Sequence, residues 1–183
     1  MSRIFGEVRQ IAFVVRDLDA ALRYWTETLG VGPFFVFRQM APIDFRYRGK
    51  ASPPPLLSIA LGNSGDVQVE LIEQHDDKPS AYRDFLASGR EGLQHVSSWV
   101  TRGGYDDLMT RELAGGRVPA HEGVVPGANV RFAYFDTDSA PGGVMYEMSE
   151  ALESQAAALM AMIADAARNW DGSEPIRELV LPG

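Results

Sequence analysis

A chain of 183 residues is long enough for one ordinary domain or two small fused modules, and 45% hydrophobic residues suffice for a buried core. The net charge of -8 argues against nucleic-acid phosphates and anionic membranes as partners, and the absence of cysteine excludes disulfides, thiolate metal sites and a cysteine nucleophile. No residue run reaches transmembrane length, and the N-terminus lacks the apolar segment of a signal peptide, so we expect a cytoplasmic protein with a small-molecule substrate.

The first half predicts the order β-α-β-β-β. Residues 17–29 carry Leu18, Leu22 and Trp25 at helical spacing, and Gly30 follows. Residues 41–55 are expected to be a loop or a sheet edge, because their three consecutive prolines cannot donate ladder hydrogen bonds. The expected elements are a strand at 9–15, a helix at 17–29, and strands at 34–40, 56–61 and 67–74.

The second half predicts the same order after a linker. The linker, residues 75–92, includes a short helix at 79–87, and His75 at its start is expected to be exposed. Strands are expected at 93–100, 117–124, 130–137 and 144–149, with a helix through Tyr105, Leu108, Met109 and Leu113 that ends at Gly115 and Gly116. The single domain 1–183 therefore divides into modules at 8–74 and 93–150, an alanine-rich helix at 151–170 and a tail at 171–183.

The C-terminal helix carries an apolar stripe. Its members Leu152, Leu159, Met162, Ile163 and Trp170 can pack on the chain's own barrel or on a partner chain. The tail has no clear prediction, although Ile176, Leu179, Val180 and Leu181 can dock as a short arm.

Polar residues occupy matching places in the two halves. Gln10 in the first strand corresponds to His95 in the segment GLQHVSSWV. Glu70 and Glu147 occupy the same position in the similar segments VQVELIE and VMYEMSE. Two carboxylates, an imidazole nitrogen and an amide oxygen form an oxygen-rich ligand set that suits zinc, nickel, cobalt or manganese. The alternative is that both glutamates pair with arginines and the histidine is only hydrogen-bonded, because buried charges need partners.

Substrate contacts are assigned from strand faces and charge. Alternation places Ser97 and Trp99 on the face of His95, and Phe35 and Phe37 together on one face of their strand. The basic cluster around residues 46–50 is either a solvated face or a patch that steers an anionic substrate. The residues assigned to substrate binding are Phe35, Phe37, Arg38, Arg46, Arg48, Ser97, Trp99, His121 and Met145. His121 is expected to be exposed or near the substrate rather than bound to metal.

The motifs QIAFVVRDLDAALRYW, LGVGPF, VEL, GLQHV and YEM resemble the vicinal oxygen chelate superfamily of glyoxalases, bleomycin-resistance proteins and extradiol dioxygenases. The resemblance covers residues 8–150 and implies an α+β fold, in which two βαβββ modules form paired half-barrels, and a homodimer. It places four metal positions on Gln10, Glu70, His95 and Glu147. This set is similar to that of glyoxalase I, whereas the chain pattern resembles methylmalonyl-CoA epimerase.

Three positions differ from these relatives, and the differences argue against particular reactions and substrates. Gln10 stands where extradiol dioxygenases have a histidine, which argues against iron-dependent ring cleavage. Val14 and Gln74 stand where glyoxalase I has an arginine and an asparagine for glutathione, which argues against that substrate.

The resemblance implies a divalent-metal enzyme that removes a proton next to a polarised carbonyl, with Glu147 as base and Glu70 as the second candidate. The reaction would be an epimerisation, an isomerisation or a lyase step. One alternative is a metal-free binding protein of the bleomycin-resistance type, and another is a degenerate member with a structural role.

Overall fold

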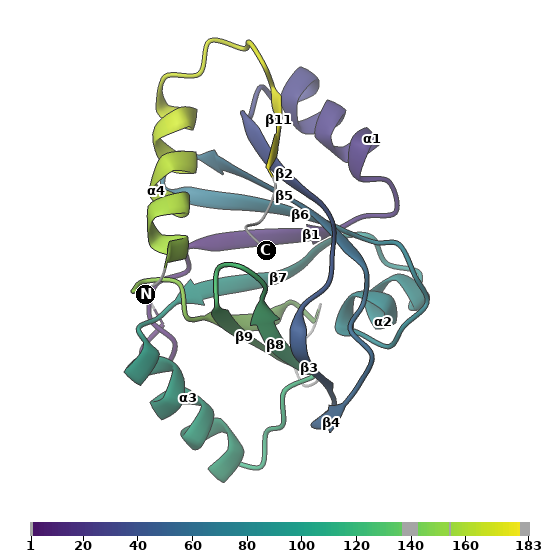
Figure 1. The fold of residues 1–183 in the computed structure, drawn as a ribbon, viewed down its shortest axis with the longest axis vertical. Coiled ribbons are helices and arrows are strands. Elements are labelled where there is room, and N and C mark those ends of the chain that lie inside the picture. Colours follow the sequence, from purple (N-terminus) through teal and green to yellow (C-terminus); the bar gives the residue numbers. More distant parts are fainter. Residues whose placement is uncertain (1, 137–142, 154, 180–183) are drawn as a thin grey trace.

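A single sheet of eleven strands runs through the part of the chain that the computed structural model describes, residues 2–136, 143–153 and 155–179. Figure 1 shows it from the side on which α4 crosses the strands. Its strands are β1 (Gln10–Val14), β2 (Phe34–Met40), β3 (Ile43–Tyr47), β4 (Lys50–Ala51), β5 (Leu57–Ser64), β6 (Val67–Gln74), β7 (Gly92–Trp99), β8 (His121–Val125), β9 (Val130–Phe135), β10 (Met145–Ser149) and β11 (Ile176–Leu179). The helices are α1 (Leu18–Arg23) with the π-helical turn η1 (Tyr24–Thr28), α2 (Ala81–Ala87), α3 (Arg102–Ala114) and α4 (Gln155–Arg168).

The two halves meet at the centre of the sheet, where β1 and β7 pair antiparallel. In each half the last strand lies parallel to the first, β6 beside β1 and β10 beside β7. The sheet order β11-β2-β5-β6-β1-β7-β10-β9-β8-β3-β4 thus contains the β-α-β-β-β unit twice. The predicted α+β fold with two βαβββ modules and a C-terminal helix is confirmed.

Strand register brings the matching polar residues together. Ala12 is the cross-strand partner of Glu70 in β6 and of His95 in β7. Ser97 is in turn the partner of Gln10 in β1 and of Glu147 in β10. Four residues that are far apart in the sequence therefore lie on adjacent central strands.

The predicted helix at 17–29 is present but changes its winding midway. Asp17 caps it by accepting a hydrogen bond from the backbone N–H of Ala20 at 2.8 Å, and α1 continues into η1 at Tyr24. Thr26 in the π-helical turn donates its hydroxyl to the carbonyl of Leu22 at 2.8 Å. A hydroxyl bonded to the backbone in this way accompanies local changes of helix geometry.

The segment 41–55 contains β3 and β4, which form one edge of the sheet, so the sheet edge rather than the loop is the correct one of the two expectations. The register of β2 against β5 shifts between Phe37 and Met40, where Gln39 has a φ of 50°. The chain then leaves the first half, and β3 pairs with β8 of the second half. The strand predicted at 117–124 starts only at His121.

The helices cover both faces of the sheet. α1 packs against Val36, Val69 and Leu71 on one face of the first half, and α3 covers Ala133, Phe135 and Met148 of the second. α4 lies on the opposite face of the first half, with Ile163 against Phe35, Phe37 and Leu61 (Figure 1). Leu159 and Ile163 of the predicted stripe thus pack on the chain's own sheet, whereas Leu152 and Met162 are exposed.

The tail supplies an edge strand, since β11 pairs parallel with β2. Ile176 and Leu179 of the predicted arm belong to it, while Val180 and Leu181, and Thr137 of the predicted strand at 130–137, lie outside the described residues. No helix in the described ranges is both long and apolar enough to cross a membrane.

Candidate active site

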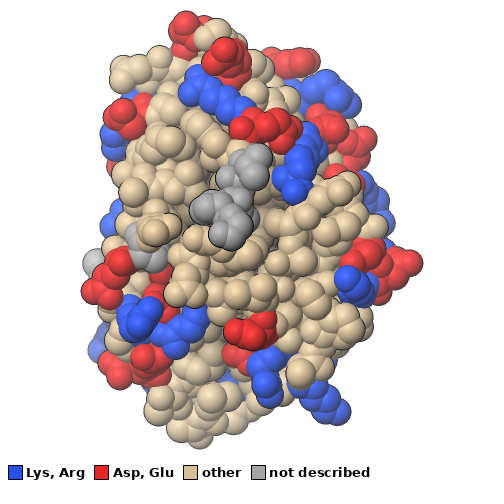
Figure 2. All heavy atoms as spheres, viewed as in Figure 1, with Lys and Arg blue, Asp and Glu red and all other residues tan. Residues whose placement is uncertain are grey.

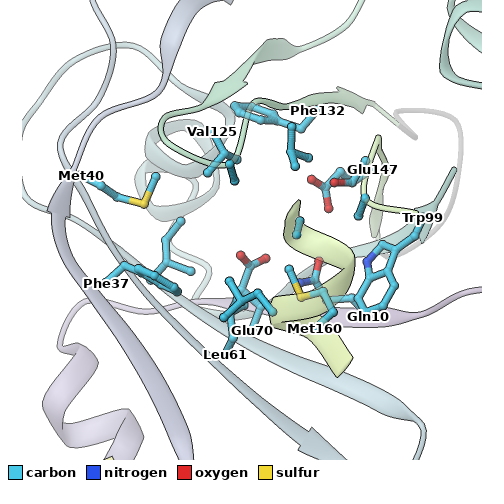
Figure 3. Close-up of a pocket in the computed structure, with 17 residues that line it drawn as sticks. Gln10, Phe37, Met40, Leu61, Glu70, Trp99, Val125, Phe132, Glu147 and Met160 are labelled. Atoms are coloured by element: carbon cyan, nitrogen blue, oxygen red, sulfur yellow. The ribbon is translucent and has the colours of Figure 1, made fainter. Parts of the chain in front are cut away.

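The sheet and α4 enclose a cavity of about 100 Å³ at the central strands. Gln10, Glu70 and Glu147 point into it from three strands, and Trp99 borders it (Figure 3). The rest of the lining is almost entirely apolar: Phe37, Met40, Ile59, Leu61, Val125, Ala128, Val130, Phe132, Ser149, Ala151, Ala156, Leu159 and Met160. The site is therefore a small cluster of polar groups in an apolar chamber, which is the usual character of small-molecule sites.

His95 lies fully buried between the two carboxylates. Its Nε2 is 3.4 Å from Oε2 of Glu70 and 3.5 Å from Oε2 of Glu147. Burial opposes the charged imidazolium, but hydrogen bonds to Glu147 and Glu70 outweigh it and raise the pKa of His95 to about 9. Burial likewise raises the pKa of Glu70, against the opposing effect of His95. Without metal, a proton on His95 balances part of the carboxylate charge.

A bulge in β7 orients His95. Ala12 faces His95 and Phe13 faces Leu93, so Gln94 is an extra residue without a partner in β1. Gln94 and His95 are both fully buried although they are neighbours in a strand. Gln94 Oε1 lies 2.6 Å from Nδ1 of His95, and its amide donates to the sulfur of Met145 at 2.8 Å. An amide oxygen accepts only from Nδ1–H, which leaves Nε2 facing the carboxylates.

A second amide holds Gln10. Its Nε2 donates to Oε1 of Gln68 at 2.7 Å, and Gln68 donates in turn to the sulfur of Met160 on α4 at 3.0 Å. The amide oxygen of Gln10 is thereby left toward the cavity (Figure 3). This chain of contacts connects the C-terminal helix to the polar cluster.

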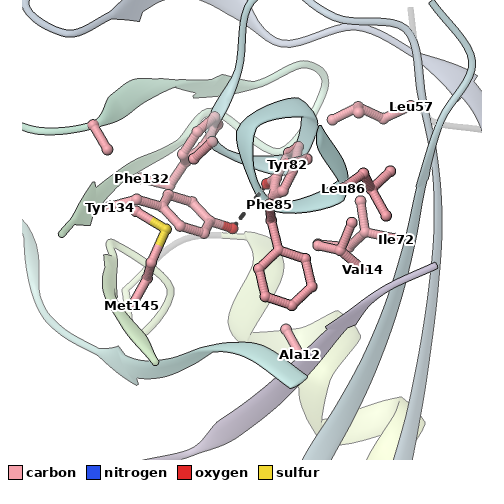
Figure 4. Close-up of a cluster of buried hydrophobic side chains, with 12 residues drawn as sticks. Ala12, Val14, Leu57, Ile72, Tyr82, Phe85, Leu86, Phe132, Tyr134 and Met145 are labelled. Atoms are coloured by element: carbon pink, nitrogen blue, oxygen red, sulfur yellow. Dashed lines mark hydrogen bonds between the residues drawn. The ribbon is translucent and has the colours of Figure 1, made fainter. Parts of the chain in front are cut away.

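Two tyrosines lie behind the cluster. The hydroxyl of Tyr134 is 3.3 Å from Nε2 of His95 and accepts a hydrogen bond from Tyr82 of α2 at 2.9 Å (Figure 4). Burial raises the pKa of both tyrosines well above 10, so they stay neutral donors. Ser97 Oγ is also buried here and has no hydrogen-bond partner among the described residues.

The donor chemistry fits a divalent ion, although the side chains are not arranged for one. Within the described ranges, no group of three or more His, Asp or Glu side chains is disposed to hold a metal as it stands. Nevertheless, the separations of 3.4 and 3.5 Å from His95 Nε2 to Oε2 of Glu70 and Glu147 match the roughly 3.4 Å between ligand atoms of a tetrahedral ion with bonds of about 2.1 Å.

The residues assigned to substrate binding fall into two groups. Phe37 and Trp99 line the cavity, and Ser97 lies beneath it between Gln10 and Glu147. Phe35 packs against Ile163, and Met145 belongs to the buried cluster around α2 in Figure 4.

The basic residues lie away from the cavity lining. Arg38 pairs with Asp19 and Glu178, Arg46 with Glu122, and Arg48 with Asp84 and Asp136, each arginine at least one-third exposed. These ion pairs connect different elements at the surface, which agrees with the interpretation of the basic cluster as a solvated face.

His121 is fully buried, so the exposed position among its two predicted alternatives is wrong, and it is not one of the residues that line the cavity. Its ring contacts Tyr82, Phe132 and Tyr134 with centroids 4.3 to 5.9 Å away, and Nδ1 accepts from the N–H of Ala81 at 3.3 Å. Nε2 has no partner in the described part of the chain. Burial and the charge of His95 lower the pKa of His121 to about 3. It is a neutral core residue.

The sequence analysis missed Gln68, Gln94, Tyr82 and Tyr134. Gln68 precedes Glu70 by two residues and shares its strand face, so alternation was a usable signal. No sequence signal indicated Gln94, because the bulge reverses the alternation of strand faces on which the prediction rested.

Comparison with known proteins places these features in context. A family model described as Glyoxalase/Bleomycin resistance protein/Dioxygenase superfamily matches residues 9–135, which include Gln10, Glu70 and His95 and end before Glu147 and α4. No curated protein matches the chain.

Solved structures with the same fold include two whose function is stated. The methylmalonyl-CoA epimerase from Mycobacterium tuberculosis is 20% identical with a TM-score of 0.54, covering 81% of this chain and 90% of that one. A variant of the Streptomyces coelicolor enzyme in complex with 2-nitronate-propionyl-CoA is 17% identical with a TM-score of 0.51, covering 79% and 94%. A hypothetical protein from Bacillus halodurans is 20% identical with a TM-score of 0.53, covering 78% and 92%. At these identities the likeness is one of fold.

Proposed function

Because the chain belongs to the glyoxalase/bleomycin resistance protein/dioxygenase superfamily, we propose that it is a divalent-metal-dependent epimerase, isomerase or lyase that removes a proton next to a carbonyl. The observation that carries the proposal is the convergence of Gln10, Glu70, His95 and Glu147 at one small, mostly apolar cavity. Zinc is the first candidate, with nickel, cobalt and manganese as alternatives, and it would supply positive charge to polarise the carbonyl oxygen.

The ligands have different capacities for proton transfer. Gln10 has no basic atom, and its amide is held by Gln68. His95 is held through Nδ1 by Gln94, which leaves Nε2 for the metal. Glu70 and Glu147 each have a second carboxylate oxygen, and the family resemblance favours Glu147 as the base.

The surroundings support this chemistry. The apolar walls and α4 limit water near the carboxylates, and low polarity strengthens the interaction of charges with a developing enolate. The Tyr134 hydroxyl, neutral and close to His95 Nε2, is available to donate a hydrogen bond beside the carboxylates.

Two measurements test the proposal. Purified protein reconstituted with zinc, nickel, cobalt or manganese is expected to hold about one ion per chain, and His95→Ala is expected to lose it. In heavy water with a substrate, Glu147→Gln should keep metal while slowing hydrogen exchange by on the order of a hundredfold. If Glu70→Gln alone slows the exchange, Glu70 is the base, and if neither does, proton abstraction is wrong.

The second candidate is a metal-free binding protein of the bleomycin-resistance type. The observation in its favour is that the polar cluster is not arranged for metal within the described residues. Finding wild type and His95→Ala equally metal-free after reconstitution would favour this function over the enzyme.

A further inference from the structure

The walls of the cavity carry no positive side chain. None of the described lining residues is Lys, Arg or an accessible His, and the residues outside the described ranges include none of the three. The arginines expected to steer an anion are in ion pairs elsewhere. On the face shown in Figure 2, basic and acidic side chains are interspersed rather than gathered by sign.

Charge balance leaves nothing to neutralise an anionic substrate. The carboxylates of Glu70 and Glu147 lie 3.4 and 3.5 Å from Nε2 of His95, and one divalent ion bound between these groups would carry no charge in excess of the two carboxylates. A substrate carboxylate or phosphate would therefore bring an unbalanced charge into an apolar chamber, and the burial of an unpaired charge is strongly unfavourable.

The cavity is also small. Its volume of about 100 Å³ is below the roughly 300–1,000 Å³ of sites for drug-sized ligands. Leu159 and Met160 of α4 form one wall, and Met160 is fixed there through Gln68.

We infer that the cavity takes a compact, uncharged carbonyl compound with small apolar substituents. The reacting chemistry rests on the proposed function, but selection for a neutral ligand comes from the walls and can be measured by binding alone. Phe37 and Leu61 would contact the alkyl groups, and a hydroxyl of the ligand would donate to Glu70 or Glu147, because the carboxylates and the Gln10 amide oxygen at the cavity are acceptors.

The test compares acetoin with lactate, which differ only in a terminal methyl group replaced by an oxygen anion. Binding to the metal-free and the zinc-loaded protein is followed by the NMR signal of the Trp99 indole N–H, assigned with Trp99→Phe. Acetoin is expected to bind at least about tenfold more tightly than lactate in both forms. Equal or tighter binding of lactate would overturn the inference.

Two matched variants on one helix locate the effect. Met160→Lys puts a cation in the cavity wall and should shift the preference toward lactate by at least about tenfold, whereas Met162→Lys, on the exposed side, should leave it within about twofold. If Met160→Lys does not fold, Met40→Lys places the same charge in the wall from β2. Equal effects of the wall variant and the Met162 variant would mean that binding occurs elsewhere.

The outcomes separate this inference from the proposed function. Acetoin binding without metal uptake or hydrogen exchange would keep the inference and reject the enzyme. Metal uptake together with hydrogen exchange on hydroxy acids but not on hydroxy ketones would keep the proposed enzyme function and reject the inference.

Discussion

At the scale of single residues, the orientation of His95 depends on one extra residue in β7. The bulge turns Gln94 inward, so that its amide oxygen accepts from Nδ1 of His95 and Nε2 is directed at the carboxylates. Partners of this kind commonly contribute 10- to 100-fold to metal affinity.

Gln94→Leu is therefore expected to weaken metal binding by roughly 10- to 100-fold. Gln94→Glu keeps an acceptor for Nδ1–H and should restore most of the affinity. Competition with a chelator measures both, and thermal unfolding of the metal-free variants shows whether they are folded. Equal losses in the two variants would assign Gln94 to packing alone.

His121 gives a prediction about acid. Its pKa in the folded state, about 3, is below the unfolded value of 6.5, so the unfolded chain binds the extra proton between these pH values. Stability should thus fall as pH drops through this window, by up to about 1.4 kcal/mol per pH unit from this residue.

Urea unfolding of wild type and His121→Phe between pH 3.5 and pH 7 checks this contribution. The variant should be less stable at pH 7, because the N–H of Ala81 loses its acceptor, but its stability should fall less steeply toward acid. Parallel slopes for the two proteins would contradict the assignment.

The sequence predicted which residues lie together at the cavity better than how they are held. The internal duplication identified Gln10, Glu70, His95 and Glu147. Residues at equivalent positions of the two modules occupy equivalent positions in the sheet. Gln94 and Tyr134 were not predicted, because neither a β-bulge nor a contact between distant strands changes the hydrophobic periodicity of the sequence. His121 was misjudged because its ring packs against Tyr82 of α2 and against Phe132 and Tyr134 of β9, and its own segment HEGVV gives no sign of these contacts.

At the scale of elements, Ile163 is the most deeply buried residue of α4. Ile163 is fully buried against Phe35, Phe37 and Leu61, whereas its neighbour Met162 is exposed. Ile163→Ala should reduce the free energy of unfolding by about 2–5 kcal/mol, and Met162→Ala by no more than about 0.5 kcal/mol. Urea denaturation measures both losses. Similar small losses would mean that α4 is not part of the cooperative fold.

The missed elements share a physical cause. β3 and β11 are short and pair with strands distant in the sequence, β8 and β2, so their own residues carry little strand signal. Elements with clear periodicity, such as β6 and the helix formed by α1 and η1, were predicted where they occur. The stripe on α4 was recognised, but only the fold shows that the sheet of the same chain covers Leu159 and Ile163.

At the scale of the whole molecule, this packing removes one argument for a homodimer. Leu159 and Ile163 are satisfied within the chain, so the family resemblance alone now supports the dimer. The homodimer stays a prediction, and light scattering at micromolar concentration should give twice the mass of 20.1 kDa. A monomeric mass would refute it.

Metal binding and folding should be linked through a proton. In the metal-free protein the pKa of His95 is about 9 against 6.5 in the unfolded chain, so its contribution to stability is complete below pH 6.5 and is lost as pH rises toward 9. A metal needs the neutral imidazole and must displace that proton. Its affinity should therefore rise about tenfold per pH unit over the same window, as the stability of the metal-free protein falls.

Cobalt titrations and urea unfolding between pH 6.5 and pH 9 test this linkage, because Co²⁺ reports its own binding by absorbance. Wild type should gain affinity with pH and lose metal-free stability, by up to about 1.4 kcal/mol per pH unit. His95→Gln cannot exchange a proton and should show neither trend from this residue. Cobalt affinity that is independent of pH in the wild type would mean that no proton lies between His95 and the two carboxylates, and that the ion binds elsewhere.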